Sequence, residues 1–564
     1  MNSFKNIIKL TCLLLLAAKA DAQTIYTNGK IITVDAKNTI AEAVAVKEGK
    51  IIAVRTLKDI QKFKGPHATV IDLKGKTLVP GFIDGHSHFM GLSRSALVNV
   101  GSPPMGEVKN IADLVAKIQA FQQEKKIPAG EWIDAYGYDQ DQLEEKRHPR
   151  KEDLDAAFPN NPVTITNING HMSVSNSYAL KISGITAATV NPAGGAIERQ
   201  KGNNEPTGLL QEGATRLLKR PARPAPTFDE QLKDLKEKQL FYASHGITTA
   251  QDGYTSFESL ILLHKAAEKG ALFIDIETLP GYPTLDKVIG NPEYKFGVLN
   301  NHLKLAGTKL VADGSPQGKT AFFSKSYLVE VPGCNHDECT GFPNVTQQQF
   351  NEAINKAFKN NIRPFVHCNG DATIDMYLKA IENANKELNT SSNDRRPVTI
   401  HSQFVRADQL DAYKRLGIIA AMFSNHAYFW GDVHIRNLGL DRASFLSPLK
   451  TALKKGVVAT NHTDYPVTPV NQIFLLWTSV VRESRSGRVI GPDERLTPLE
   501  GLRAITINGA YEYQEEKLKG SIEKGKLADF AILSEDITTI DPSKIKDVVV
   551  LETIKEGKTI YKKQ

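Results

Sequence analysis

Two histidines separated by one residue, His86 and His88, directly follow an apolar stretch that ends in Pro-Gly-Phe-Ile-Asp-Gly. In an extended strand, residues i and i+2 point to the same side of the backbone, so this spacing predicts two imidazoles that face one point. Such a pair suits a divalent first-row metal, and a metal beside a carboxylate supports metal-assisted hydrolysis. A lone His-x-His pair is more often a surface or strand-filling pair. The metal prediction therefore depends on further ligands at later strand ends.

Three further candidate ligands stand at the ends of later strand-like segments. His367 follows Pro364–Val366, His401 follows Val398–Ile400, and Asp464 lies just beyond the last such segment. Each residue taken alone is more often a core or surface residue. Parallel strands of a barrel present their C-terminal ends at one face, where such enzymes build their active sites. Four histidines and one aspartate at that face therefore predict a metal site.

The segments that must position these residues alternate with helical patterns, which favours a parallel sheet. Eight strand-like segments are expected: Leu78–Ile83, Ile247–Gln251, Leu272–Thr278, Thr308–Ala312, Pro364–Val366, Val398–Ile400, Ile418–Phe423 and Val457–Thr460. Eight strands separated by helices predict an α/β fold that closes as a (β/α)8 TIM barrel. Residues 91 to 240, after the first strand, are too many for a loop and predict a large insert.

Short strand-like segments occupy both ends of the chain. Residues 24–76 alternate strands with Asn-Gly and Glu-Gly turns, and residues 525–561 continue this pattern with another Glu-Gly turn. We expect the two ends to join in one small β-sandwich. The expected boundaries are residues 1–22 for a signal peptide, 23–76 and 511–564 for the two parts of the β-sandwich, and 77–510 for the barrel with its insert.

The first 22 residues have the pattern of a secretory signal peptide. Lys5 and Lys9 precede the apolar run Leu10–Ala18, and residues 20–22, Ala-Asp-Ala, form a small-x-small cleavage site. That run is too short for a stable membrane span, and no later run has the length needed to cross a bilayer. We expect an exported protein, periplasmic or secreted, with no membrane span in the mature chain.

Composition and charge are those of an ordinary globular protein. Of the 564 residues, 41% are hydrophobic and 24% charged, and the net charge of +7 is spread along the sequence. No basic stripe carries interleaved aromatic residues, which argues against a nucleic-acid partner. Cys334 and Cys339 are expected to form a disulfide, although His336 between them leaves a metal site as an alternative. Cys368 is expected to be a buried structural thiol rather than a nucleophile.

In order and spacing, these motifs resemble the amidohydrolase superfamily, in the amidohydrolase-3 branch of N-substituted formamide deformylase-like metal-dependent hydrolases. The resemblance covers nearly the whole chain beyond residue 22. The residues that carry it are Pro80–His88, Asn169–His171, Asn176-Ser177, Glu205–Gly208 with Glu212, Gly246–Thr249 with Asp252-Gly253, Lys309 with Ala312–Ser315, His367 with Gly370–Ala372, His401, Asp464 with Pro466, and Gly525–Asp529.

The resemblance implies a set of metal ligands: His86, His88 and Asp464 for one metal, and His367 and His401 for a second. Lys309 matches a strand-4 lysine that is carboxylated in similar proteins, where it bridges two cations. Burial on an apolar strand would lower the pKa of this lysine and so favour carboxylation. The alternative is a surface or salt-bridged lysine. One or two divalent metal ions are expected, with zinc preferred.

The sequence departs from the family pattern at three places beside the ligands. Ile400 stands where Glu usually precedes the strand-6 histidine, and Cys368-Asn369 replace small apolar residues. Asn461–Pro466 replaces the usual Gly-Ser-Asp-Ala-Pro. Such neighbours orient ligands and tune a bound metal, so these changes leave the substrate open while the ligand set itself is intact.

The expected reaction is hydrolysis of a C–N bond in a non-peptide amide by metal-activated water, with Asp464 as general acid and base. His171 in the insert and His426 after the seventh strand are candidate substrate-binding residues. The alternatives are ester or lactone hydrolysis or deamination on the same fold, and a non-catalytic secreted binding or regulatory protein. The expected partner is a small-molecule substrate, and a homodimer is left open.

Overall fold

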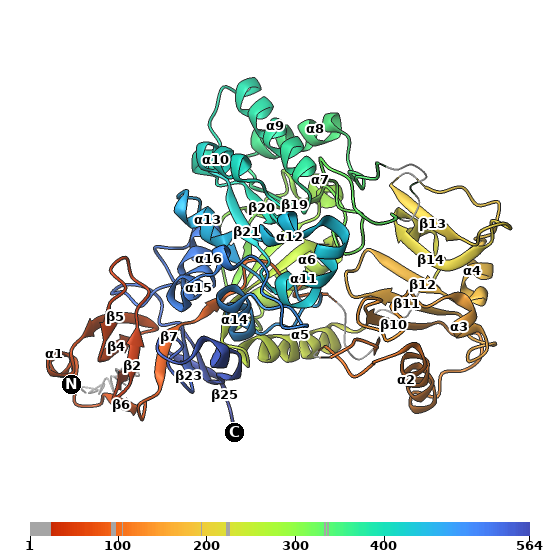
Figure 1. Ribbon diagram of the computed structural model, residues 1–564. Coiled ribbons are helices and arrows are strands. Elements are labelled where there is room, and N and C mark those ends of the chain that lie inside the picture. The colour runs from red at the N-terminus through yellow and green to blue at the C-terminus, as the bar shows by residue number, and fades with distance from the viewer. Residues whose placement is uncertain are drawn as a thin grey trace, which may run out of the picture.

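The computed structural model describes residues 24–91, 97–103, 105–192, 194–221, 226–331, 334 and 338–564. The expected signal peptide at residues 1–22 lies outside the described residues. Within those residues the chain is an α/β structure whose strands form five sheets (Figure 1). Across the same ranges, no helix is long and apolar enough to cross a membrane.

Two parallel sheets at the centre of the molecule carry the residues expected at the site. Their strand orders are β17-β16-β15-β8 and β18-β19-β20-β21-β22. The strands are β8 (Phe82–Ile83), β15 (Ile247–Thr255), β16 (Asp275–Pro280), β17 (Leu303–Leu305), β18 (Thr308–Val311), β19 (Pro364–Cys368), β20 (Val398–His401), β21 (Ile419–Met422) and β22 (Ala459–Asn461). A parallel bridge between Gly281 and Lys309 links the two sheets. Because all neighbours are parallel, the C-terminal strand ends gather at one edge of each sheet.

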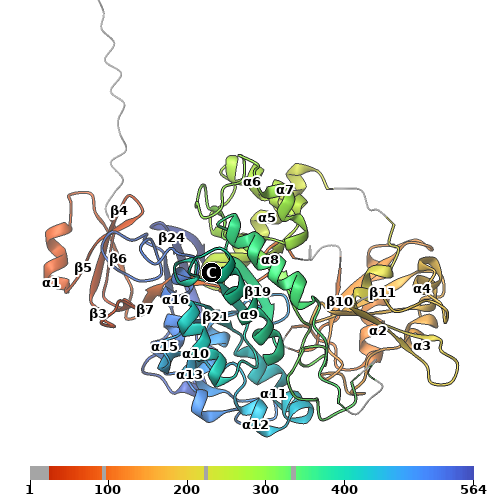
Figure 2. The ribbon, with the colours of Figure 1, turned by 90° about the horizontal axis from the view of Figure 1, so that it is seen from above.

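Helices alternate with these strands and surround the two sheets (Figures 1 and 2). They are α5 (Phe228–Ala243), α6 (Phe257–Glu268), α7 (Leu285–Val288), α8 (Gln347–Lys359), α9 (Asp371–Glu387), α10 (Ala407–Leu416), α11 (Asn425–Leu438), α12 (Leu440–Ser444), α13 (Leu449–Lys454), α14 (Gln472–Val481), α15 (Pro498–Ala504) and α16 (Ile507–Glu512). In α8, Phe350, Ile354 and Phe358 repeat every four residues and are buried in one core with Val366 of β19. Burying each such side chain stabilises the fold by roughly 1.5–3 kcal/mol.

The single first strand expected at Leu78–Ile83 is wrong, because Gly81 divides it between two sheets. Residues before Gly81 form β7 (Thr77–Pro80) in the sheet of the chain ends, and residues after it form β8. A Cβ atom at Gly81 would lie 2.5 Å from the Thr248 side chain, so only glycine allows this close approach to β15. The histidine motif therefore follows a strand of two residues.

Strands from both chain ends share one six-stranded sheet of order β25-β24-β23-β7-β2-β3. They are β2 (Lys30–Ile32), β3 (Ile40–Ala41), β23 (Phe530–Leu533), β24 (Val550–Lys555) and β25 (Lys558–Lys562), together with β7. In the antiparallel β7–β23 pair, Val79 lies opposite Ala531. A four-stranded sheet completes this region with β1 (Thr24–Thr27), β4 (Ala43–Lys47), β5 (Lys50–Arg55) and β6 (Thr69–Asp72). The two sheets share a core in which Tyr26 meets Phe530 edge to face.

The insert forms a sheet of its own, on the opposite side of the central sheets from the chain-end strands (Figures 1 and 2). Its strands are β9 (Val98–Asn99), β10 (Ile133–Tyr138), β11 (Val163–Asn167), β12 (Met172–Ser175), β13 (Gly195–Arg199) and β14 (Pro206–Glu212). Helices α2 (Ile111–Glu124), α3 (Lys151–Asp155) and α4 (Ser177–Ser183) accompany the sheet. Leu114, Tyr138 and Ile165 belong to a separate hydrophobic core, so the insert is internally packed.

A buried network of ion pairs joins β16 to the C-terminal part of the chain. Asp275 accepts hydrogen bonds from Lys519, at 2.5 Å, and from Lys555, at 2.8 Å. Lys519 also pairs with Glu515 at 2.7 Å, and Lys555 with Asp529 at 2.8 Å. Burial alone would raise the pKa of Asp275, but the two ammonium groups hold it well below its usual value. The network is therefore charged, and each partner depends on the others.

The cysteines behave as expected. Cys334 and Cys339 are joined by a disulfide, and His336 lies outside the described residues. Cys368 is buried in β19, where burial raises the pKa of its thiol well above the usual value. A thiol that does not ionise is a poor nucleophile, which agrees with a structural role.

Candidate metal centre

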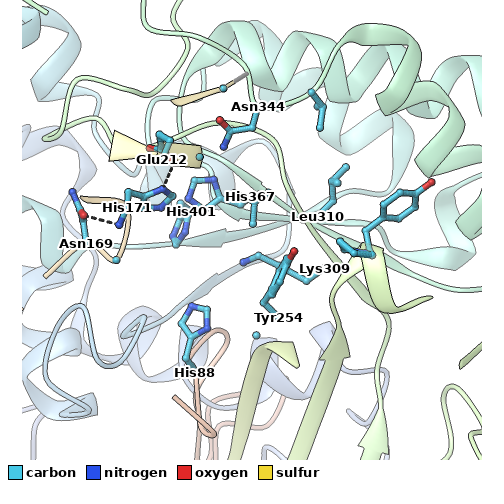
Figure 3. A pocket seen from close by; sticks show the side chains of 18 of the residues that line it. His88, Asn169, His171, Glu212, Tyr254, Lys309, Leu310, Asn344, His367 and His401 are labelled. Atoms are coloured by element: carbon cyan, nitrogen blue, oxygen red, sulfur yellow. Dashed lines mark hydrogen bonds and ion pairs between the residues drawn. The ribbon is translucent and has the colours of Figure 1, made fainter. Parts of the chain in front are cut away.

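All six predicted metal ligands line one cavity of about 780 Å³: His86, His88, Lys309, His367, His401 and Asp464. Figure 3 labels four of them, His88, Lys309, His367 and His401. The six ligands arrive from β8, β18, β19, β20 and β22, either on the strand or just beyond its C-terminal end. The loops after β8 and β22 are joined by two backbone hydrogen bonds, from Asp464 to His86 at 2.9 Å and from His88 to Tyr465 at 2.8 Å. These bonds hold the aspartate against the histidine pair.

Asp464 lies between the histidine groups. Its Oδ1 is 3.3 Å from Nε2 of His88 and 3.5 Å from Nε2 of His86. Its Oδ2 faces His401, with Nε2 4.0 Å away, and the ring of His367 packs at 4.6 Å from that of His401. One carboxylate oxygen thus faces His86 and His88, and the other faces His401.

The residues present fit a divalent cation. Ligand atoms of His86, His88 and Asp464 all lie within 4.8 Å of one another. Oδ1 of Asp464 is buried and accepts no hydrogen bond from the described residues. A buried carboxylate oxygen without a donor is rare, and a cation among two imidazoles would satisfy it.

The buried histidines are in the protonation state that a metal requires. Burial, assisted by nearby cationic groups, lowers the pKa of His86 and His401 well below the usual value. Burial also lowers the pKa of His367, although Asp313 opposes this shift. Coordination needs neutral imidazoles, so these rings are prepared to act as ligands near neutral pH.

Each of these three histidines is held at Nδ1 by a neighbour: His86 by Gln251 Oε1 at 2.5 Å, His367 by Asp313 Oδ1 at 3.2 Å, and His401 by His462 Nε2 at 3.0 Å. Fixing Nδ1 sets the orientation of a ring and leaves Nε2 to face the metal position. Asp313 also accepts hydrogen bonds from the backbone of Asn369 and Gly370. The supporting groups are thus themselves fixed.

Lys309 lies within the same group of ligands. Its side chain is buried in β18, and Nζ is 3.0 Å from Nε2 of His86. Burial lowers the pKa of Lys309 to about 7, so a large share of the amine is neutral at physiological pH. A surface or salt-bridged lysine is excluded, because Lys309 is 2% exposed and, among the described residues, its Nζ contacts an imidazole rather than a carboxylate.

His171 brings the insert into the cavity wall. It lies between β11 and β12, and its ring is 5.5 Å from that of His367. Nδ1 of His171 lies 2.9 Å from Oε2 of Glu212, as the dashed line in Figure 3 shows. Burial opposes protonation of His171, but Glu212 outweighs burial and raises its pKa. A hydrogen-bond donor is therefore available beside the predicted ligands.

Family comparison agrees with this geometry. The sequence matches the amidohydrolase family (Amidohydro_3) over residues 69–561. The chain belongs to the amidohydrolase family. It is a metal-dependent hydrolase in the general sense that the family implies.

Relatives of this amidohydrolase extend over nearly its whole length. It is 28% identical to N-substituted formamide deformylase of Arthrobacter pascens, over 95% of this chain and 98% of that protein. It is 29% identical to the protein LONG AFTER FAR-RED 3 of Arabidopsis thaliana, over 96% of this chain and 92% of that protein. A crystal structure of an uncharacterized metal-dependent hydrolase from Pyrococcus horikoshii matches with a TM-score of 0.70, at 21% identity, over 93% of this chain and 99% of that one. That structure supports the fold.

His426 of the amidohydrolase lies beside the centre rather than in the main cavity. It is part of α11, its Nδ1 is 3.0 Å from Nε2 of His434, and its ring packs against Phe423 and Trp430. It lines a side recess of about 20 Å³ that also borders His171. Within this narrow recess, His426 can contact only a small group.

Sequence reasoning missed His462 of the amidohydrolase, which supports His401. The residue directly follows β22 and is fully buried. The only signal was its position in the segment that departs from the family pattern, because the contact with His401 joins strands 61 residues apart in the chain. Gln251, which holds His86, was missed for the same reason, since the two residues are 165 positions apart in the chain.

Replacing His462 by Leu is expected to weaken the binding of a divalent metal by about 10- to 100-fold, the usual effect of removing a group that orients a ligand. Loss of His462 leaves Nδ1 of His401 without its partner in a buried site. Competition with a chromogenic chelator measures the affinity. His67→Leu, at an exposed position, is the control and should leave the metal affinity unchanged. Equal affinities of His462→Leu and wild type would contradict this role.

Proposed function

We propose that this amidohydrolase hydrolyses a non-peptide C–N bond, with Asp464 as general acid and base. The observation that carries the proposal is the position of Asp464, with one oxygen facing His86 and His88 and the other facing His401. From this position the carboxylate can contact both a cation and a water molecule beside it. General acid–base catalysis requires such direct contact with the proton that moves.

The proposed mechanism assigns a task to each group. One or two divalent cations, with zinc as the first candidate, would supply Lewis-acid activation of a water molecule and of the substrate carbonyl. Asp464 accepts a proton from the attacking water and later gives it to the leaving nitrogen, so that the C–N bond breaks and a neutral amine departs. His171 donates a hydrogen bond to the carbonyl oxygen, and Glu212 fixes its ring. His426 borders the recess in which a small substituent would lie.

We also propose that the two central sheets close as a (β/α)8 barrel around this site, with β17 and β18, which are only two residues apart, together forming one of the eight strands. The Gly281–Lys309 bridge joins them on one side. On the other side, the hydrogen bonds between the His86–His88 segment and residues 464–465 bring β8 to β22. In this organisation the barrel covers residues 81–510 rather than 77–510, with an insert at about 91–240, and residues 23–80 and 511–564 form a β-sandwich, because β7 pairs within the sheet of the chain ends.

A substrate panel tests the proposed reaction. The Arthrobacter pascens relative is named a deformylase of N-substituted formamides, so the panel starts with N-alkyl and N-aryl formamides and adds larger amides, esters, lactones and amino-heterocycles. We expect zinc-loaded protein to release amine from at least one amide, and a chelator to abolish this release. Turnover of esters or lactones alone, or deamination alone, would favour the corresponding alternative. No turnover by fully loaded protein would favour a binding or regulatory role.

Lys309 is expected to carry a carboxyl group on Nζ. After incubation with ¹³C-bicarbonate, the wild-type protein should show a carbamate carbon signal by NMR, because the buried neutral amine can react with carbon dioxide. Lys309→Met should lack that signal and bind less zinc. Lys295→Met, at an exposed position, serves as the control. A spectrum without a carbamate signal in wild-type protein would exclude carboxylation.

We propose that residues 1–22 direct export and are then removed, which places the mature protein in the periplasm or outside the cell. The proposal is supported by the order of features in this segment, in which basic residues precede an apolar run and small residues follow it. N-terminal sequencing of the protein from its native cells should start at Gln23. A protein that keeps Met1 and fractionates with cytoplasmic markers would refute export.

A further inference from the structure

A second cavity, of about 360 Å³, lies where the insert meets the central part of the molecule. Its walls come from the loop after β10, from β12, β13 and β14 of the insert sheet, from residues 317–329, and from the end of α11. The lining includes Lys146, Arg150, Met172, Gln317, Lys319 and Asn437. A cavity of this volume is within the range of small-molecule sites. The proposed C–N hydrolysis makes no use of it.

Positive charge predominates in the lining of this cavity. Five lining side chains are cationic and two are acidic, Asp141 and Glu198. Both acids have partners, since Asp141 pairs with Arg436 at 2.6 Å and Glu198 accepts a hydrogen bond from Thr207 at 2.5 Å. The cavity therefore has an excess of positive charge.

Three of the cations have no carboxylate partner. Within the described residues, Lys146, Arg150 and Lys319 take part in no ion pair. Lys146 donates one hydrogen bond to the Asp141 carbonyl at 2.8 Å, and Lys319 donates one to the Glu330 carbonyl at 2.9 Å. An ammonium group has three N–H donors, so each lysine keeps donors for a ligand.

Two buried amide side chains in the wall also need partners. Asn437 is fully buried, and neither Oδ1 nor Nδ2 has a hydrogen-bond partner among the described residues. Gln317 is 4% exposed, and its Oε1 is unpaired as well. Buried amides are normally hydrogen-bonded, so these groups are unused donors and acceptors that lie behind the surface of the cavity.

The cavity also has an apolar side and lies close to the metal centre. Met172 and Val329 line it, which suits a hydrocarbon group better than an inorganic ion. Gln317 lines both this cavity and the recess bordered by His367 and Asp464. Gln317 therefore borders both spaces.

We propose that this second cavity binds a small organic carboxylate. Lys146, Lys319 and Arg150 attract the carboxylate, and Met172 and Val329 contact its hydrocarbon part. Charge-assisted hydrogen bonds from lysine and arginine are the usual means of holding such a group. This site is separate from the ligands of the metal and does not depend on the reaction catalysed there.

Calorimetric titration of the chelator-treated full chain with benzoate tests the proposal. Benzamide is the neutral probe of the same shape, and inorganic phosphate is the anionic probe without a hydrocarbon part. We expect saturable binding of benzoate, and at least about 10-fold weaker binding of benzamide, because the charge-assisted contacts are lost. Lys319→Met and Lys146→Met should each weaken benzoate binding by about 10-fold. Lys181→Met, at an exposed position on α4, should bind benzoate like wild type.

Several outcomes would overturn the proposal. Equal binding of benzamide and benzoate would show that charge does not select the ligand. Tighter binding of phosphate than of benzoate would assign the site to an inorganic anion instead. Unchanged benzoate affinity in both Lys319→Met and Lys146→Met would place the binding elsewhere in the molecule.

Discussion

Asp464→Asn is expected to lower kcat for the best amide of the panel by about 10²- to 10⁴-fold. An amide side chain keeps the shape of the carboxylate but cannot accept the proton of the attacking water. It also removes the negative charge that faces His86, His88 and His401. Steady-state kinetics under zinc saturation measures kcat, and elemental analysis of the same sample reports how much metal remains.

A matched control separates chemistry from folding in this experiment. Asp441→Asn makes the same change at an exposed position of α12 and should retain wild-type kinetics. Circular dichroism should show the same spectrum for both variants. If Asp464→Asn kept more than a tenth of wild-type kcat with full metal content, Asp464 would not be the general acid and base.

Lys519→Met is expected to lower the free energy of unfolding by about 3–5 kcal/mol, the effect of breaking a buried ion pair by removing one partner. Lys519 is 1% exposed and contacts Asp275, Glu515 and the Thr249 hydroxyl. Its loss leaves one ammonium group, that of Lys555, to neutralise Asp275. A shift of the urea midpoint at constant slope measures the change.

Two further variants test whether this effect comes from uncompensated charge. Lys562→Met removes a lysine that is 72% exposed and pairs with Glu552, so a change of at most about 1 kcal/mol is expected. The double variant Lys519→Met with Asp275→Asn should be more stable than the sum of the two single changes predicts. Additive losses in the double variant, or a midpoint of Lys519→Met equal to that of wild type, would contradict the charge argument.

Local pattern was sufficient to predict much of the central sheets. The strands at 364–368 and 398–401 are short, apolar and buried, so their composition alone marks them. Because strand ends gather at one edge of a parallel sheet, His367 and His401 could be expected to lie together. The family recognised from these motifs is confirmed. The chemical roles of the site residues stay predictions.

Features that depend on contacts between distant segments could not be predicted from the sequence. The chain passes from one sheet to another at Gly81, because β7 pairs with the C-terminal strand β23 and β8 pairs with β15. Nothing in residues 77–83 reveals those neighbours. The short strand β17 follows a turn at Asn300 and His302 and has little β-forming pattern of its own. His462 gained its role from a residue on another strand. Spacing along the chain cannot show such partners.

The pairing of β7 with β23 also constrains the order in which the protein can form. Synthesis proceeds from the N-terminus, so the strand just before the histidine motif has no partner on that side until more than 440 later residues have been made. Contacts between such distant segments close slowly because the intervening chain must be ordered first. Meanwhile the open edge of β7 is available to other chains, as unpaired edges are in partly folded proteins. The C-terminal strand β23 thus covers the last open edge of β7. A chain whose synthesis stops before β23 keeps that edge unpaired.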